Sequence, residues 1–567
     1  MNTKLQFRVL YRQFLFRLMD LELLSASAQG DASVLLGQLG ALLVFGSLFL
    51  AFLAMPMGDD IRSKGSAAAV WAAERFLISL TMLVVGLFAL LSWDSTFPDR
   101  RDVLVLAPLP IRERTLFAAK IAAAASALGL TVVAWNSLAG FTWPMALAPT
   151  GSGFAGTLRF GAALWATLLG AGTFLYCTVL GVQAAAAQLP RRWYLRLSSF
   201  LQIALFVLFL SVALFQPSID TPAALAAPEN QRTLAWLPTY WFTGLLSELS
   251  GAFRIEGHAV MAPLARRAMM NLPIAICVAS GAFLLSYLRT LRKIVEEPDI
   301  LPNSRGGIWL PRFGNSPQTA LAQFVIRSLL RSRRHRTILA FYLGGGFALA
   351  AVFLEGAREA MHMNWQSLVQ PANVLMLFAS VVMLCASWLG VRTVFSLPLD
   401  ARANWLFRVT PAPQGAPCLS AVRRALLALS VLPVVAVSAA LWLWFWPWTT
   451  LAEHLLLLGL LGSVLVDTSL LGFRKIPFTC SYLPGKSKVH MVFWFGILPL
   501  VATIATAVRL EQKAMQNPLS YGCLAVALGA AAFVARQVTD RSAGRNPPEI
   551  QFEESPSDEL IGLGLNR

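Results

Sequence analysis

Residues Asp94 to Lys120 read DSTFPDRRDVLVLAPLPIRERTLFAAK, a basic segment, punctuated by prolines, that separates two long apolar runs. A second segment of the same kind, Asp400 to Arg424, reads DARANWLFRVTPAPQGAPCLSAVRR and also lies between apolar runs. Each segment contains a Pro-x-Pro element followed ten residues later by a basic residue, Lys120 in the first and Arg423 in the second. This repetition predicts a chain made of two related halves.

The composition excludes an ordinary soluble protein. Of the 567 residues, 57% are hydrophobic and 13% are charged, and the mean hydropathy is +0.62. A helix needs about 20 mainly apolar residues to cross the hydrocarbon layer, and the alternating segments of a membrane β-barrel are absent. We therefore expect an all-α integral membrane protein, because helices satisfy their own backbone hydrogen bonds in lipid.

Apolar runs of spanning length fall into two sets of six. The first set covers residues 34–55, 76–93, 115–138, 160–187, 196–215 and 268–288. The second set covers residues 338–355, 373–391, 422–447, 452–472, 491–508 and 519–535. Because six spans return the chain to its starting side, the expected fold has about 12 transmembrane helices in two parallel six-helix repeats.

An amphipathic segment precedes each set of spans. In residues 1–25, apolar and basic residues recur at steps of three and four, as in a helix that lies in the membrane interface; a first helix packed on protein is the alternative. Gln323-Phe324 and the arginines that follow repeat this pattern. We thus predict a first half, a cytoplasmic linker rich in Pro and Gly, a second half and a largely disordered cytoplasmic tail, which cover residues 1–290, 291–320, 321–536 and 537–567.

The longest external segment, 216–265, contains the aromatic stretch WLPTYWFTGLLSEL, Trp236 to Leu249. Its aromatic side chains suit the depth of the lipid headgroups. An external interfacial helix and a plain aromatic anchor both fit this pattern.

Topology accounts for the net charge of +17. When the N-terminus is placed in the cytoplasm, most of the 46 lysines and arginines fall in cytoplasmic segments, as the positive-inside rule requires. Both termini are then cytoplasmic, and the high proportion of basic residues requires no nucleic-acid partner.

The sequence contains no motif for a catalytic, cofactor-binding or metal-binding residue. Pro484 to Ser487 has the Gly-Lys-Ser end of a phosphate-binding loop, but Cys480 stands where the first glycine of that loop belongs. The six cysteines and five histidines are scattered without metal-ligand spacing.

Two acidic residues are candidates for a functional group inside the membrane. Asp467 lies well inside an apolar run, where a carboxylate costs roughly 2.5–3.5 kcal/mol. Glu453 stands beside His454 at the start of the same run. The alternatives are a basic partner for Asp467 at Arg474 or Lys475, and an interfacial acid and histidine pair at the other end.

The arrangement of residues 1–290 resembles that of the permeases of type-2 ATP-binding-cassette exporters. The shared features are an interfacial helix, six spans, external helices between spans five and six, and a segment D-x-L-x-x-x-P-L-P after the second span. In such permeases this last segment forms a coupling helix that docks into a separate ATPase subunit. The second half resembles them less well, because Asn404 replaces the acid, one residue is inserted and the external helices have no counterpart.

The resemblance implies two ATPase-docking regions, which we call the coupling segments 94–120 and 396–424. The implied docking residues of the first are Arg100, Arg101, Asp102, Pro108, Pro110, Arg112 and Arg114, and those of the second are Arg402, Asn404, Pro411 and Pro413. Because the first segment keeps the acid and more arginines, docking at the two halves is expected to be unequal.

The resulting expectation is an exporter permease of the bacterial cytoplasmic (inner) membrane, a transport component and not itself an enzyme. It would bind no cofactor, and ATP would be hydrolysed on partner ATP-binding-cassette subunits. A twelve-span secondary carrier driven by an ion gradient, dependent on Asp467 or Glu453, is one alternative. A membrane scaffold or a membrane enzyme that acts on lipids is another.

Overall fold

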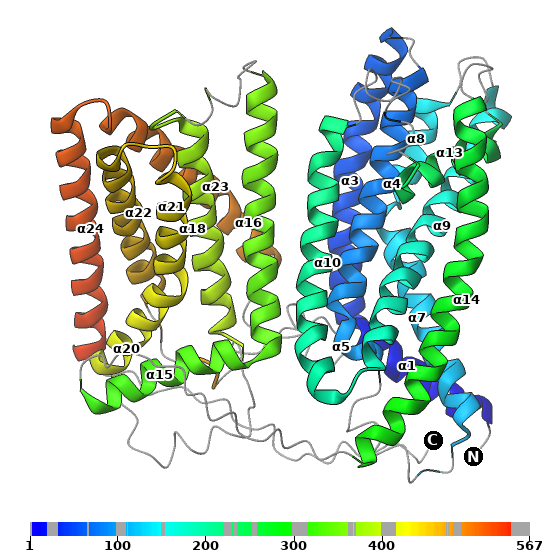
Figure 1. Cartoon of the computed structure of the whole chain (residues 1–567), viewed down its shortest axis with the longest axis horizontal. Coiled ribbons are helices and arrows are strands. Elements are labelled where there is room, and N and C mark those ends of the chain that lie inside the picture. The colour runs from blue at the N-terminus through cyan, green and yellow to red at the C-terminus, as the bar shows by residue number, and fades with distance from the viewer. Residues whose placement is uncertain are drawn as a thin grey trace. The chain divides into compact units, whose positions relative to one another are not determined.

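The computed structural model describes residues 3–19, 32–64, 67–97, 109, 111–148, 153–219, 230, 235–251, 258–296, 315–360, 367, 370–397, 415–471, 473, 476–479 and 489–545. Every regular element in these ranges is a helix (Figure 1), which confirms the predicted all-α fold class. The chain divides into two compact units, Met1–Asn303 and Ser304–Arg567. The division falls inside the stretch expected to be a linker.

Unit 1 is a helical bundle centred on α9. Its helices are α1 (Thr3–Met19), α3 (Ala32–Lys64), α4 (Ala67–Leu91), α5 (Trp93–Thr96), α7 (Glu113–Trp135), α8 (Ala139–Leu147), α9 (Gly153–Ala187), α10 (Arg191–Ile219), α13 (Pro238–Ser250) and α14 (His258–Glu296). Helix α9 packs against α4, α7, α8, α10, α13 and α14. The buried Trp93 of α5 donates its indole N–H to the Ser198 hydroxyl of α10 at 2.8 Å, and its carbonyl accepts from the Gln183 amide of α9. These bonds fix the short helix α5 to two long ones.

Unit 2 is a second bundle, centred on α18. Its helices are α15 (Ser316–Arg331), α16 (Arg333–Ala360), α18 (Val374–Val394), α20 (Ala416–Leu426), η3 (Leu427–Val431), α21 (Leu432–Trp442), α22 (Trp448–Ser469), α23 (Val489–Ala514) and α24 (Pro518–Arg545). Helix α18 packs against α16, α20, η3, α21, α22 and α23.

Helices α20, η3 and α21 form one continuous span in which η3 is a π-helical turn. Pro433 lies just after this turn, and it lacks the N–H that would bond to the carbonyl four residues back. The widened turn therefore accommodates the proline without breaking the span.

Eight helices in the described part of the chain are long and apolar enough to cross a membrane. They cover Ala69–Leu91, Arg114–Trp135, Gly153–Ala187, Met261–Tyr287, Val374–Val394, Ala416–Trp442, Trp448–Ser469 and Pro518–Arg541. The prediction of a helical integral membrane protein is confirmed at this level. The four other expected spans, 34–55, 196–215, 338–355 and 491–508, lie within α3, α10, α16 and α23, and the described stretches Leu39–Met55 of α3 and Phe200–Ala213 of α10 are apolar.

Each expected amphipathic segment forms a helix whose apolar face packs on protein. Helix α1 buries Leu10, Phe14 and Leu18 against Ala119 and Ala123 of α7. Helix α15 runs across one end of the unit 2 bundle (Figure 1) and packs on α20 in the same manner. In both units the amphipathic helix thus rests on the helix in which a coupling segment ends.

The aromatic stretch Trp236 to Leu249 forms a helix over Pro238–Ser250, α13, and two of its aromatic side chains pack on protein. Tyr240 and Phe242 are buried, because α13 lies against α4, α9 and α14, whereas Trp236 is 82% exposed. A Cβ at Gly244 would lie 2.7 Å from the carbonyl oxygen of Met261, so this glycine permits the close approach of α13 to α14. The segment is therefore mainly a packing element of unit 1.

Candidate functional site: buried basic residues at the ends of the coupling segments

Most of the predicted docking residues lie outside the described residues. These are Arg100, Arg101, Asp102, Pro108, Pro110, Arg402, Asn404, Pro411 and Pro413. Arg112 and Arg114 are described, and both side chains are exposed. Arg112 is the N-cap residue of α7 and has an extended backbone, with φ −72° and ψ 131°, so the chain straightens there before the helix begins.

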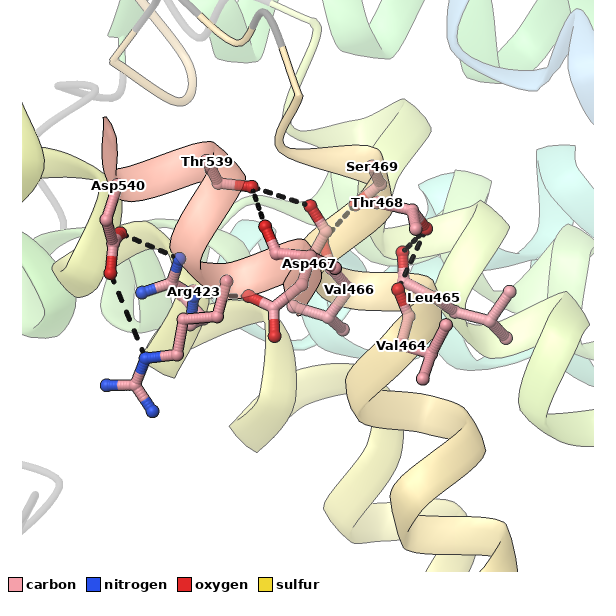
Figure 2. Close-up of polar contacts among 11 residues, drawn as sticks. Arg423, Val464, Leu465, Val466, Asp467, Thr468, Ser469, Thr539 and Asp540 are labelled. Atoms are coloured by element: carbon pink, nitrogen blue, oxygen red, sulfur yellow. Dashed lines mark hydrogen bonds and ion pairs between the residues drawn. The ribbon is translucent and has the colours of Figure 1, made fainter. Parts of the chain in front are cut away.

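The buried guanidinium group of Arg423 binds two carboxylates from two other helices (Figure 2). Its Nε donates to Oδ1 of Asp467 at 2.5 Å, and its Nη2 donates to Oδ1 of Asp540 at 3.0 Å. The side chains of Arg423 and Asp467 are 5% and 7% exposed. The cluster therefore joins α20 to α22 and α24 through charge-assisted hydrogen bonds.

The helices present these groups at the ends of their spans. Asp467 lies two residues before the end of α22, and its backbone carbonyl accepts a hydrogen bond from the Thr539 hydroxyl of α24 at 3.4 Å. Asp540 is the next residue on α24, and Arg536 lies one turn before it, with Nε 4.0 Å from Oδ2. The Asp540 side chain is 40% exposed, so water screens this outer part of the cluster.

Asp467 has a basic partner, as one of the two interpretations predicted, but the partner is a residue that the sequence did not suggest. Arg474 and Lys475 lie outside the described residues, and the observed partner is Arg423, which precedes Asp467 by 44 residues. The only sequence signal for this partner was the repeated step from Pro-x-Pro to a basic residue. Asp467 is thus a buried carboxylate with a specific charge partner at the end of its span.

Lys120 occupies the matching place in unit 1 and is also buried, with 3% of its surface exposed. Its Nζ lies 5.2 Å from the ring centroid of Phe14 on α1 and 5.5 Å from that of Tyr287 on α14. The ammonium group therefore makes cation–π contacts to two helices. In each unit, the basic residue at the end of the coupling segment contacts the last long helix of that unit: Lys120 contacts α14, and Arg423 contacts α24.

A second buried ionisable pair lies at the opposite end of α22 from Asp467. His454 Nδ1 is 2.6 Å from Oε1 of Glu511 on α23, and the Trp446 ring lies edge-on to the imidazole at 5.6 Å. Among the described residues, His454 Nε2 has no hydrogen-bond partner. The predicted Glu453 is half-buried, and its backbone carbonyl accepts from the Tyr521 hydroxyl at 3.2 Å. The buried acid at this position is thus Glu511, which sequence reasoning did not identify.

Unit 1 contains a further buried acid, Glu74 on α4. Its side chain is buried, and Oε2 has no hydrogen-bond partner in the described part of the chain. The neighbouring Arg75 lies over the Tyr240 ring of α13, 3.8 Å from the ring centroid. Both charged residues therefore lie inside the span Ala69–Leu91, whereas the expected span began only after them.

Comparisons of the chain with protein-family models, with curated proteins and with solved structures find no match.

Proposed function

We propose that this chain is a membrane permease, with two six-span halves that line one translocation route. Separate ATPase subunits would dock on the coupling segments 94–120 and 396–424 and drive transport by hydrolysing ATP. The membrane would be the bacterial cytoplasmic membrane, with the coupling segments on the cytoplasmic side.

The observation that carries this proposal is the buried basic residue at the end of each coupling segment. Arg423 ties α20 to Asp467 of α22 and Asp540 of α24, and Lys120 ties α7 to aromatic rings of α1 and α14. A push on either segment would act on a helix that is held to the last helix of the bundle, as rigid-body coupling requires. A loop that only fixed topology would have no need for a buried ionic or cation–π link.

The contact pattern of the two units also supports a repeated architecture. In unit 1, α4 packs on α9 and α10, and α9 packs on α14. In unit 2, α18 packs on α22 and α23, and α22 packs on α24. These are the pairings expected between corresponding spans when the halves are matched in chain order.

Capture of an ATPase subunit tests the proposal directly. The tagged full chain is co-expressed with candidate ATP-binding-cassette subunits and purified in lipid nanodiscs. Charge reversal of Arg100, Arg101 and Arg112 to Glu should abolish capture, because docking needs charges for orientation. The matched control is Arg266→Glu, an exposed arginine on α14 outside both coupling segments. Capture that survives the triple reversal, or failure of every candidate ATPase to bind, would refute the proposal.

Unequal docking is tested in the same assay. Alanine replacements of Pro108 and Pro110 should weaken ATPase capture more than replacements of Pro411 and Pro413. Equal losses from the two pairs would contradict the asymmetry.

The buried His454–Glu511 pair favours one other candidate, a secondary carrier driven by an ion gradient. Carriers of this kind hold protonatable groups inside the membrane, and Glu74 would be a second such group. In that case transport would continue after ATP depletion at a constant ion gradient and would be lost in Glu511→Gln. Loss of transport on ATP depletion alone would exclude this candidate.

A further inference from the structure

A groove of about 360 Å³ lies between α9, α13 and α14 of unit 1. Its walls include Phe174 and Gly181 of α9, Trp241 of α13, and Asn271 and Ile274 of α14. Both long helices are of spanning length, over Gly153–Ala187 and Met261–Tyr287, so the groove lies at the depth of the hydrocarbon layer. A volume of this size is typical of a small-molecule site and is too small to hold another helix.

Asn271 supplies the unused polar group of the groove. It lies near the middle of the span Met261–Tyr287 and is only half-buried, and its amide has no hydrogen-bond partner in the described part of the chain. Two residues later, Pro273 lacks the N–H that would bond to the Met269 carbonyl. Polar groups at this depth are costly unless they are paired, which favours an occupant with a hydrogen-bonding group of its own.

The hydroxyl and indole groups of the wall are already satisfied. The Thr178 hydroxyl donates to the Phe174 carbonyl at 2.8 Å, and the Trp241 indole N–H donates to the Ala235 carbonyl at 2.8 Å. The Trp241 ring also packs edge-on against Phe174, with centroids 5.8 Å apart. The aromatic wall is therefore fixed, and Asn271 is left to select the ligand. None of the described lining residues carries a charge, so an ion or a charged headgroup would find no counter-charge there.

We propose that this groove binds an uncharged, mainly hydrocarbon molecule that carries one hydrogen-bonding group, a hydroxyl or a carbonyl, and enters from the bilayer. The hydrocarbon part lies against Phe174, Trp241 and Ile274, and the polar group bonds to the Asn271 amide. A plain acyl chain of a phospholipid would leave that amide unpaired. The proposal requires only that α9 and α14 span the bilayer, so it holds whether or not an ATPase docks on this chain.

Gly181 offers a way to fill the groove without disturbing the fold. A Cβ at this position would meet no atom within 4 Å, so Gly181→Leu places its side chain in open groove space. Gly281→Leu is the matched control, because Gly281 of α14 also has open space around its Cβ but does not line the groove. Both variants exchange a helical glycine for a good helix former.

Photolabelling of the full chain in phospholipid nanodiscs tests the proposal. The probe is a long-chain alcohol with a mid-chain diazirine, compared with the same hydrocarbon without its hydroxyl, and the labelled peptides are identified by mass spectrometry. The alcohol should label residues 174–182 and 271–279 both in the natural chain and in the control variant Gly281→Leu. In the Gly181→Leu variant this labelling should be abolished. Asn271→Leu should lower labelling by the alcohol about three-fold, the effect of one average interhelical hydrogen bond in a membrane, and leave labelling by the hydrocarbon unchanged.

Three results would overturn the proposal. Undiminished labelling of Gly181→Leu would show that the probe does not occupy the groove. Equal labelling by the alcohol and the hydrocarbon would show that lipid chains fill it without selection. Cross-links between two copies of the chain at residues 271–279, in place of probe labelling, would show that the groove face is a contact between copies.

Discussion

Replacing Arg423 by methionine is predicted to destabilise unit 2 by about 3–5 kcal/mol, the usual cost of removing one partner of a buried ion pair. The cost arises at Asp467, whose side chain is 7% exposed and would remain as an uncompensated carboxylate. Asp540 should add little to this cost, because its side chain is 40% exposed and water can solvate it. For a unit of this size, the loss corresponds to a fall in apparent Tm of about 6–20 °C.

The second partner provides a sharper test. When Arg423→Met is combined with Asp467→Leu, no buried charge is left, and apolar packing should restore most of the lost stability. The control is Arg536→Met, because the Arg536 side chain is 60% exposed and its Nε lies 4.0 Å from Oδ2 of Asp540. This variant should have the same Tm as the natural chain. The measurement is thermal unfolding of the full chain in nanodiscs, followed by tryptophan fluorescence.

The double variant also separates stability from coupling. If the proposed function holds, the double variant should still capture the ATPase, but transport should no longer follow ATP hydrolysis, because the ionic link to α24 is lost. The reasoning on Arg423 would be refuted if Arg423→Met unfolded at the temperature of the natural chain. It would also be refuted if the losses from the two single changes simply added in the double variant.

Three further predictions concern other parts of the bundles. Lys120→Met should speed hydrogen exchange in α1 by loss of the cation–π contacts, whereas Lys120→Arg should keep the protection; equal exchange in both variants would contradict this. His454→Phe should lower the free energy of unfolding by about 3–5 kcal/mol, because Glu511 stays buried without a partner, and Glu511→Gln should cost less; the reverse order would disprove the assignment. Gly462→Ala should cost about 1–3 kcal/mol, because its Cβ would lie 2.7 Å from a valine of η3, whereas Gly459→Ala on the same helix meets no atom within 4 Å; equal melting temperatures would argue against this packing.

The class of fold could be predicted because hydrophobicity along a spanning helix is a local property. The run expected at 373–391 corresponds to the helix Val374–Val394. Where a span contains charges, the same reasoning failed. The run expected at 76–93 was cut at Glu74 and Arg75, whereas the span extends back to Ala69 and buries both residues.

The candidate site could be predicted only in part, because it depends on which helices are neighbours. Asp467 was identified from its depth in an apolar run, but its pairing with Arg423 requires α20 and α22 to lie side by side. The aromatic residues of α13 are an ambiguous signal for a related reason. Tyrosine and tryptophan suit a headgroup layer and a helix interface equally, since both surroundings accept an apolar ring with a polar edge.

The π-helical turn η3 has a consequence for any comparison of the two units. A π turn holds an additional residue within one turn, so this membrane helix can absorb an insertion that would otherwise need a loop. An alignment that forbids gaps inside spans would match Lys120 with Arg423. Beyond Val431 the additional residue would shift the register, so that the alignment would pair the wrong faces of α7 and α21. Similarity of sequence between the units would fade at this point even if both descend from one gene segment. The pattern of helix neighbours is therefore the better basis for a comparison of the two units.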